Sequence, residues 1–237
     1  MNKGICTVSV APLRAEASHQ SEMTSQLLYG ESFDFLKSET RFTKIKMHLD
    51  GYEGWVDNQQ ISTISEEDFG ARKFSVATQT VGIYELSQGN TLLSIGSEVL
   101  SKTPTTLNPP SSENISKTAK QFLNVPYLWS GRSFFGLDCS GFVQLVYKLH
   151  GFSLPRNAAQ QAEVGDVLSF VEESKPGDLA FFENIDGIIT HVGLMLDDQQ
   201  IIHAYGKVRI DTLDSTGIFN KDLNKHTHKL RFLRSIF

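Results

Sequence analysis

Apolar and polar residues alternate along most of the first hundred positions. Between residues 5 and 62, four segments show apolar side chains at alternate positions or enrichment in β-branched residues: ICTVSVAPL, QLLYGESFDFLKSE, FTKIKMHLDGYEGWV and QQIS. Turn-forming residues punctuate this region at Gly30, Asp50-Gly51 and Gly54. Alternation of this kind between turns is typical of short antiparallel strands. The pattern predicts a small antiparallel β-barrel over residues 1–62.

Residues 63–112 continue the strand-like pattern in FSVATQTVGIYEL and TLLSIGSEVLS, with a turn expected at Ser87 to Asn90. This region is predicted to form a second β unit, or an extension of the first, followed by a linker. The linker is TPTTLNPPSSEN, in which Pro, Thr, Asn and Ser replace the alternating pattern. A domain boundary is therefore expected at about residue 112.

Clear helical spacing follows this boundary. One face of a helix capped by Ser112 carries the apolar side chains of Ile115, Ala119, Phe122 and Leu123. A second amphipathic helix is predicted from about Asp138 to Gly151. Strand-like segments then follow in DLAFFE, HVGLML, QQIIHAYG, VRIDTL and LRFLRSIF. Helices followed by a run of strands predict an α+β fold, with residues 113–237 as the second domain.

Composition and charge restrict the classes of function. The chain has 237 residues, and its formal net charge of -5 comes from 27 acidic residues interspersed with 22 basic ones. Nucleic acid is not an expected partner, because no basic footprint is present. A membrane is not expected either, since no stretch approaches the roughly 20 apolar residues that cross a bilayer. The N-terminal stretch lacks a signal-peptide core, so the chain is expected in the cytoplasm, with Cys6 and Cys139 as free thiols.

Cys139 lies where a Gly-rich and aromatic segment, YLWSGRSFFGLD, meets the second predicted helix. Unpaired N–H groups and the helix dipole stabilise an anion at this end, so a thiol there can have its pKa lowered from about 8.5 into the range of about 3.5–7.5. A buried structural cysteine is the alternative interpretation, because free cysteine is commonly buried. The presence of a base nearby decides between the two.

Two histidines could supply that base and its orienting partner. His191 begins HVGLML, and His203 follows in IIHAYG after a DDQQ turn. Antiparallel strands joined by such a turn can place two side chains together on one face of a sheet. A thiol nucleophile needs a base that takes its proton and later protonates the leaving amine, and the base needs an orienting group. The predicted catalytic residues are therefore Cys139, His191 and His203.

Four separated motifs resemble one known family. YLWSGRS, DCSGFV, THVGLML and IIHAYG occur here in the order that they have in the NlpC-type cell-wall cysteine peptidases, a papain-like family that cleaves peptidoglycan stem peptides. The resemblance covers residues 113–237. It implies that Cys139 is the nucleophile, His191 the base and His203 the orienting residue, and it implies no cofactor.

The same resemblance implies residues that bind substrate. Tyr127 matches an aromatic residue whose hydroxyl lies near the thiolate. Asp138 and Ser140 match positions that bind the amine and carboxylate ends of a γ-linked D-glutamate.

The N-terminal region is also similar to a known domain. APLRAEASHQSEMTSQLLYGE and GYEGWVD resemble the bacterial Src-homology-3-like barrel that precedes the catalytic domain in cytoplasmic family members acting on recycled muropeptides. In those relatives an acid and a tyrosine of the barrel hold the free amine of L-Ala. Glu22 and Tyr52 are the predicted counterparts, with Glu16 or Glu53 as alternatives to Glu22.

These resemblances predict a cysteine endopeptidase that hydrolyses the γ-D-glutamyl bond to a diamino acid in murein peptides with a free N-terminal L-Ala. One segment departs from the family: LPRNAAQQ has Asn157 and Ala158 where LPRDS is usual. Loss of a hydroxyl that bonds a carboxylate would weaken recognition by about 1.5–3 kcal/mol if nothing compensates. Ser130-Gly131-Arg132 replaces a common Gly-Gly and could shape the rim of the groove.

Three other functions compete with this prediction. A metal-dependent hydrolase could use Cys139, His191, His203, His226 and His228 as ligands, but HExxH and CxxC motifs are lacking, and NKDLNKHTHK reads as a polar loop. A catalytically retired protein that only binds murein peptides is the second alternative. Amidases and acyltransferases of the same fold are the third, and the N-terminal barrel disfavours them.

Overall fold

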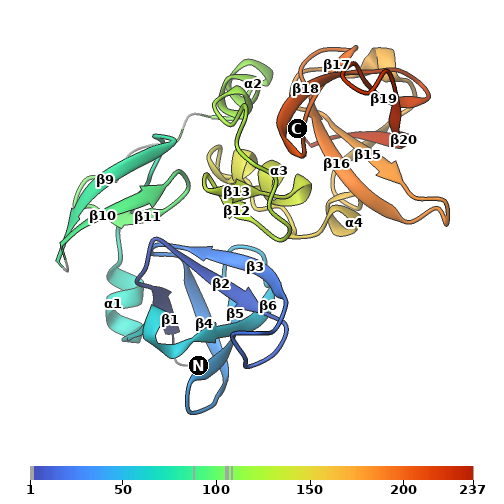
Figure 1. Cartoon of the computed structure of the whole chain (residues 1–237). Coiled ribbons are helices and arrows are strands. Elements are labelled where there is room, and N and C mark those ends of the chain that lie inside the picture. Colours follow the sequence, from blue (N-terminus) through green and yellow to red (C-terminus); the bar gives the residue numbers. More distant parts are fainter. Residues whose placement is uncertain (1–2, 88, 105–106, 108, 237) are drawn as a thin grey trace. The chain divides into compact units, whose positions relative to one another are not determined.

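The computed structural model describes residues 3–87, 89–104, 107 and 109–236 (Figure 1). The chain divides into two compact units. Unit 1 comprises Met1–Leu107 and Trp129–Gly136, and unit 2 comprises Asn108–Leu128 and Leu137–Phe237. The predicted linker and the turn at Ser87 to Asn90 include Gln88, Thr105, Thr106 and Asn108, which lie outside the described residues.

Unit 1 is built around an antiparallel sheet in the order β3-β2-β6-β5-β4-β1-β7. Its strands are β1 (Lys3–Cys6), β2 (Val10–Arg14), β3 (Met23–Leu28), β4 (Ser32–Ser38), β5 (Phe42–Met47), β6 (Glu53–Asp57) and β7 (Ile61–Ile64), with the 3₁₀ turn η1 (Asn58–Gln60) before β7. Alternate residues of β2 are buried, as period-two patterning requires. The buried side chains include Cys6, Leu13, Phe33 and Ile45, which form one apolar core.

The region after β7 contains a helix that the strand-like pattern did not predict. Helix α1 (Glu66–Ala71) is capped by Ser65, whose hydroxyl accepts a hydrogen bond from the Asp68 N–H. Three acidic residues follow the cap in the first turn, where the helix dipole favours negative charge. Four strands complete the region in two pairs: β8 (Phe74–Val76) with β11 (Glu98–Leu100), and β9 (Val81–Leu86) with β10 (Gly89–Ser94).

A buried ion pair anchors the segment Trp129–Gly136 within unit 1. The Arg132 guanidinium donates to both carboxylate oxygens of Glu31, at 2.8 and 2.7 Å, and to the Gln26 carbonyl at 2.8 Å. The exposed fractions of the two charged side chains are 0% and 2%. Ser130, Gly131 and Arg132 are all buried, and their influence on a groove rim stays a prediction. The short strand β12 (Arg132–Ser133) pairs with β13 (Gly136–Leu137).

Unit 2 combines helices with a second antiparallel sheet in the order β14-β20-β15-β16-β17-β18-β19, closed by a further β20–β19 pairing (Figure 1). Its strands are β14 (Asp166–Leu168), β15 (Leu179–Glu183), β16 (Ile189–Met195), β17 (Gln200–Tyr205), β18 (Lys207–Leu213), β19 (Gly217–Asn220) and β20 (Lys225–Ser235). The closing pair joins six of these strands into a barrel. The predicted α+β fold with an N-terminal antiparallel β domain is confirmed.

The helices of unit 2 are α2 (Ser112–Lys120), α3 (Cys139–Lys148) and α4 (Ala158–Gln161), with the 3₁₀ turn η2 (Val171–Glu173). Every residue of α3 is buried, and this helix packs against β16 and β17. Its amphipathic predecessor α2 buries Ile115 and Ala119. Across the described ranges, none of the helices combines the length and apolar character that spanning a membrane requires.

Candidate active site

Cys139 is the first residue of α3. Asp138 caps the helix, and its carboxylate accepts a hydrogen bond of 2.6 Å from the Gly141 N–H. The backbone N–H groups of Val192 and Ser140 hydrogen-bond the Cys139 sulfur. Because Val192 follows His191 directly in β16, this contact ties the thiol to the strand that carries the predicted base.

The charge state of Cys139 differs from the expectation. Burial raises the pKa of its thiol to about 12, and the Asp138 carboxylate adds to the rise, while the Val192 and Ser140 N–H groups and Arg156 oppose it. The predicted lowering of the pKa by the helix start is therefore wrong, because desolvation of a thiolate outweighs stabilisation by the N–H groups. At neutral pH the resting sulfur is a thiol, and it needs a base in order to attack.

His191 and His203 contact each other directly. His191 Nε2 lies 2.9 Å from His203 Nδ1, and both side chains are buried. Two local features bring them together. A β-bulge between β15 and β16 falls beside His191, and bulges re-aim side chains. Gly193 leaves room for the neighbouring strand, since a Cβ there would lie 2.9 Å from the Cβ of His203.

The hydrogen bonds behind the histidines define which nitrogens carry protons. His203 Nε2 lies 3.1 Å from the Asp211 carboxylate, which can only accept, so the His203 Nε2–H is the donor. Burial lowers the pKa of His203, which is therefore neutral and has a bare Nδ1. That nitrogen accepts from the His191 Nε2–H, which leaves the Nδ1 lone pair of His191 free to act as a base.

His191 is held neutral by its surroundings. Burial lowers its pKa well below the ordinary 6.5, and His203 and His228 add to the effect. The His228 ring stacks on the His191 ring with centroids 4.2 Å apart, and burial lowers the pKa of His228 to about 4.

The prediction that NKDLNKHTHK forms a polar loop is wrong for the C-terminal part of this segment, because His226 and His228 belong to β20.

A cavity of about 360 Å³ opens beside the base. Its walls come from β16, β17 and β20 and from the segment before α3, and they comprise Tyr127, Thr190, His191, Ala204, Tyr205, Gly206 and His228. Burial raises the pKa of Tyr127 to about 12, and the Asp138 carboxylate and the ionised form of Cys139 add to the rise. The Tyr127 hydroxyl therefore stays protonated and can donate a hydrogen bond within this cavity.

Asp138 and Ser140 are joined by a residue that the motif analysis did not assign. The Arg156 guanidinium donates to Asp138 at 3.0 and 2.6 Å and to the Ser140 hydroxyl at 3.0 Å. Arg156 is 2% exposed and comes from LPRNAAQQ. The buried guanidinium places a positive charge beside the two predicted substrate-binding residues. Ala158 begins α4 and is buried, at the position where the family has serine.

The predicted amine-binding residues lie in unit 1. Glu22 is exposed, and its carboxylate accepts a hydrogen bond of 2.9 Å from the indole N–H of Trp129, which is 65% exposed. Tyr52 packs against the core of the sheet. Of the alternatives to Glu22, Glu53 is paired with Lys44 at 2.8 Å, and Glu16 is exposed. The pairing with Lys44 favours Glu22 over Glu53.

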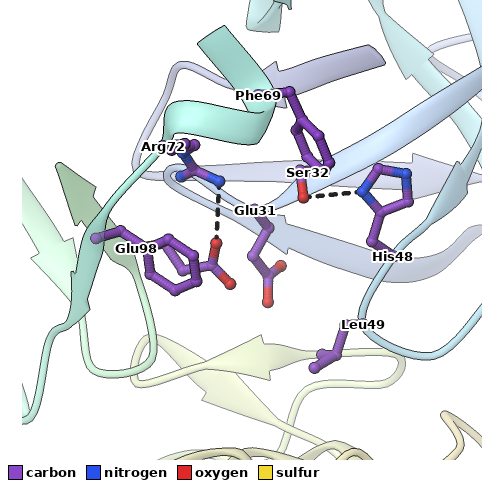
Figure 2. A pocket seen from close by; sticks show the side chains of 8 residues that line it. Glu31, Ser32, His48, Leu49, Phe69, Arg72 and Glu98 are labelled. Carbon is purple, nitrogen blue, oxygen red and sulfur yellow. Dashed lines mark hydrogen bonds and ion pairs between the residues drawn. The ribbon is translucent and has the colours of Figure 1, made fainter. Parts of the chain in front are cut away.

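A second cavity, of about 220 Å³, lies wholly within unit 1 (Figure 2). Its walls are Glu31, Ser32, His48, Leu49, Phe69, Arg72, Phe74 and Glu98. The charged side chains have partners: Arg72 pairs with Glu98 at 3.3 Å, and His48 Nδ1 lies 3.0 Å from the Ser32 hydroxyl. Within the described ranges, no group of three or more His, Cys, Asp or Glu side chains is arranged to hold a metal ion.

Comparison with known proteins agrees with this architecture. Residues 124–227 match the NlpC/P60 family, and residues 13–61 match the bacterial dipeptidyl-peptidase Sh3 domain. The chain is similar to a solved NlpC/P60 family protein from Bacillus cereus with a TM-score of 0.82 and 20% identity, covering 99% of each chain.

Two curated relatives carry the name gamma-D-glutamyl-L-lysine dipeptidyl-peptidase. The protein from Bacillus subtilis is 41% identical over 51% of this chain, and the alignment spans 42% of that relative. The protein from Bacillus cereus is 24% identical over 79% of this chain, and the alignment spans 68% of it.

A buried cysteine at the start of a helix that packs on a histidine-bearing barrel is the arrangement of the papain-like fold. Within that fold, residues 124–227 form an NlpC/P60 domain, and residues 13–61, earlier in the chain, form a bacterial Sh3 domain. The prediction of a family resemblance from DCSGFV, THVGLML and IIHAYG is confirmed.

Proposed function

We propose that this protein hydrolyses the bond between γ-D-glutamate and a diamino acid, L-lysine in the first instance, in murein peptides with a free N-terminal L-Ala. The observation that carries the proposal is the buried His191–His203 pair, together with the backbone contact that links Cys139 to Val192, the residue after His191. The choice of lysine follows the names of the two curated relatives. A role in recycling murein peptides in the cytoplasm is part of the proposal.

The reaction begins with neutral groups. The Cys139 thiol transfers its proton to His191 Nδ1 as the sulfur attacks the γ-carbonyl carbon, and the carbonyl electron pair moves onto oxygen. Backbone N–H groups at the start of α3, including that of Cys139, would stabilise this oxyanion. The C–N bond then breaks, and His191 returns its proton to the departing amine, which leaves a thioester.

Water completes the cycle. His191 takes a proton from water as the hydroxide oxygen attacks the thioester, and the sulfur leaves and is reprotonated by His191. His203 holds the His191 ring by accepting its Nε2–H. Arg156 and Ser140 are proposed to bind the α-carboxylate of D-glutamate, and Asp138 its amine end, with Tyr127 near the sulfur.

The rate should depend on pH through His191. The base acts only when its Nδ1 is unprotonated, and burial lowers the pKa of His191 well below 6.5. We therefore expect the acid limb of kcat/KM to lie below pH 6.5. Above about pH 7.7 the α-amine of the substrate loses its proton as well, so the profile is interpreted only on its acid side. The profile is measured at constant ionic strength, with circular dichroism at each pH as a control for folding. An acid limb centred at or above pH 6.5 contradicts this assignment.

Blocking the amine of the substrate should slow cleavage. If Glu22 pairs with the L-Ala ammonium, acetylation of L-Ala-γ-D-Glu-L-Lys removes a charge-assisted hydrogen bond of about 1.5–3 kcal/mol and lowers kcat/KM by about 10- to 100-fold. Glu22→Gln should lower kcat/KM for the free peptide by a similar factor and leave that for the acetylated peptide unchanged.

Glu16→Gln, which changes another exposed acid of the same region, is the matched control and should leave both rates unchanged. Equal cleavage of free and acetylated peptides by the wild type would show that no amine site operates. If the acetylated peptide is cleaved more slowly but Glu22→Gln is without effect, the amine site exists and the assignment of Glu22 is wrong.

A further inference from the structure

Behind the two histidines lies a carboxylate that the catalytic motifs do not include. We propose that Asp211 is a positioning residue that fixes the tautomer of His203 and, through it, the tautomer and orientation of His191. The kinetic effects expected for this inference rest on the proposed function. The hydrogen bonds do not, because they are present in the resting protein without substrate.

The geometry of β17 and β18 carries this proposal. The two strands pair in antiparallel register, with His203 opposite Arg209 and Ile201 opposite Asp211. His203 Nε2 lies 3.1 Å from the Asp211 carboxylate, and the exposed fractions of the two side chains are 0% and 1%. A buried carboxylate in this position accepts the Nε2–H and excludes the tautomer protonated at Nδ1.

Arg209 holds the carboxylate in place. Its Nε and one terminal nitrogen donate to the two oxygens of Asp211 at 2.7 and 2.8 Å, and the same guanidinium reaches Asp222 at 2.9 Å. Although burial raises the pKa of Asp211, its bonds to His203 and Arg209 lower it below the ordinary value. Asp211 is therefore an ionised acceptor with a fixed orientation, which is what a tautomer-setting group requires.

The other titratable groups near His203 are compatible with this role for Asp211. His191 faces His203 from β16, His228 faces it from β20, and Arg209 and Asp222 lie on the far side of the carboxylate. The three histidines have lowered pKa values and are neutral at pH 7. When His191 accepts the thiol proton, the negative charge of Asp211 favours the resulting imidazolium through His203.

Two substitutions separate the hydrogen bond from the charge. Asp211→Asn keeps a possible acceptor and removes the charge, whereas Asp211→Leu has a similar shape and removes both. We expect kcat to fall about 10-fold for Asp211→Asn and about 100-fold for Asp211→Leu, with KM within about threefold of the wild type, because the group acts on the transition state.

The matched control is Asp214→Leu. Asp214 also pairs with a histidine of unit 2, His226, at 2.9 Å, but that pair is exposed and lies outside the hydrogen-bonded chain of the site. Asp214→Leu should leave kcat, KM and the pH profile unchanged.

Two further measurements exclude a merely structural role. Because the Asp211 carboxylate raises the pKa of His203, its loss should move the acid limb of kcat to lower pH. Nitrogen-15 spectra of the resting protein should show His203 protonated at Nε2 in the wild type and a mixture of tautomers in Asp211→Leu. This second measurement needs no substrate, so it stands even if the proposed reaction fails.

A folded Asp211→Asn or Asp211→Leu variant with kcat within threefold of the wild type and an unmoved acid limb would overturn the proposal. A His203 ring protonated at Nδ1 in the wild type would also overturn it. If Asp211→Leu does not fold, the more conservative Asp211→Asn decides the kinetic question alone.

Discussion

Replacing Cys139 with alanine is expected to lower kcat for L-Ala-γ-D-Glu-L-Lys by at least about 10⁴-fold while the protein remains folded. In the proposed reaction the sulfur is the atom that bonds to the substrate carbon, and alanine offers no nucleophile in its place. Water attack in the remaining oxyanion site can account only for the residual rate. Cys139 is 7% exposed, so removal of its sulfur leaves a small space and costs little stability.

Cys6→Ala is the matched control for this substitution. Cys6 is also a buried free thiol, and burial raises its pKa to about 12 as it does for Cys139. It lies in the apolar core of unit 1, so its replacement should reduce stability slightly and leave kcat unchanged. A Cys139→Ala protein that keeps kcat within tenfold of the wild type would contradict the proposed nucleophile.

Replacing Arg132 with methionine is expected to lower the free energy of unfolding of unit 1 by about 3–5 kcal/mol, because it leaves the Glu31 carboxylate buried without its cation. The loss is large because the pair is bidentate and almost fully buried. The measurement is denaturant unfolding, followed by a probe in unit 1 because the two units can unfold in separate transitions.

Lys37→Met provides the control, since it breaks the exposed Lys37–Glu39 pair and should change stability only slightly. The double variant Glu31→Gln with Arg132→Met removes both charges and should recover part of the loss. If Arg132→Met unfolds at the same denaturant concentration as the wild type, the ion pair does not stabilise unit 1.

The catalytic elements could be predicted from the sequence because each is marked locally. A Gly-rich segment before an amphipathic helix indicates the position of Cys139, and period-two strands indicate those of His191 and His203. In the structure, His191 Nε2 lies 2.9 Å from His203 Nδ1. The two strands that carry these residues are consecutive and are joined by a turn, so their pairing is local in the sequence. The assignment of roles to these residues remains a proposal.

Residues that act through distant partners could not be predicted in this way. Asp211 interrupts the strand VRIDTL as an ordinary alternating polar residue, and its role depends on His203 and Arg209 across two strands. His228 lies in a polar run, and it becomes part of the site because β20 closes the barrel beside β15 and β19. A charged residue in a Gly-rich segment, such as Arg132, reads as exposed until its partner Glu31 is known.

The thiol pKa cannot be predicted from the sequence for a different reason. The helix start is visible in the sequence and favours an anion, but the degree of burial is a property of the folded unit. Desolvation dominates at Cys139 and at His191, so the resting site holds a neutral thiol and a neutral imidazole. The reaction therefore depends on a proton transfer at the moment of attack, which gives His191 and the groups that orient it their importance.

Mass-spectrometric analysis of the products tests the central claim most directly. Wild-type protein is incubated with L-Ala-γ-D-Glu-L-Lys alongside Cys139→Ala and Cys6→Ala. The account predicts the dipeptide L-Ala-D-Glu and free lysine from the wild type and from Cys6→Ala, and intact tripeptide from Cys139→Ala. Cleavage at the L-Ala–D-Glu bond, or the same products from Cys139→Ala at the wild-type rate, would contradict it.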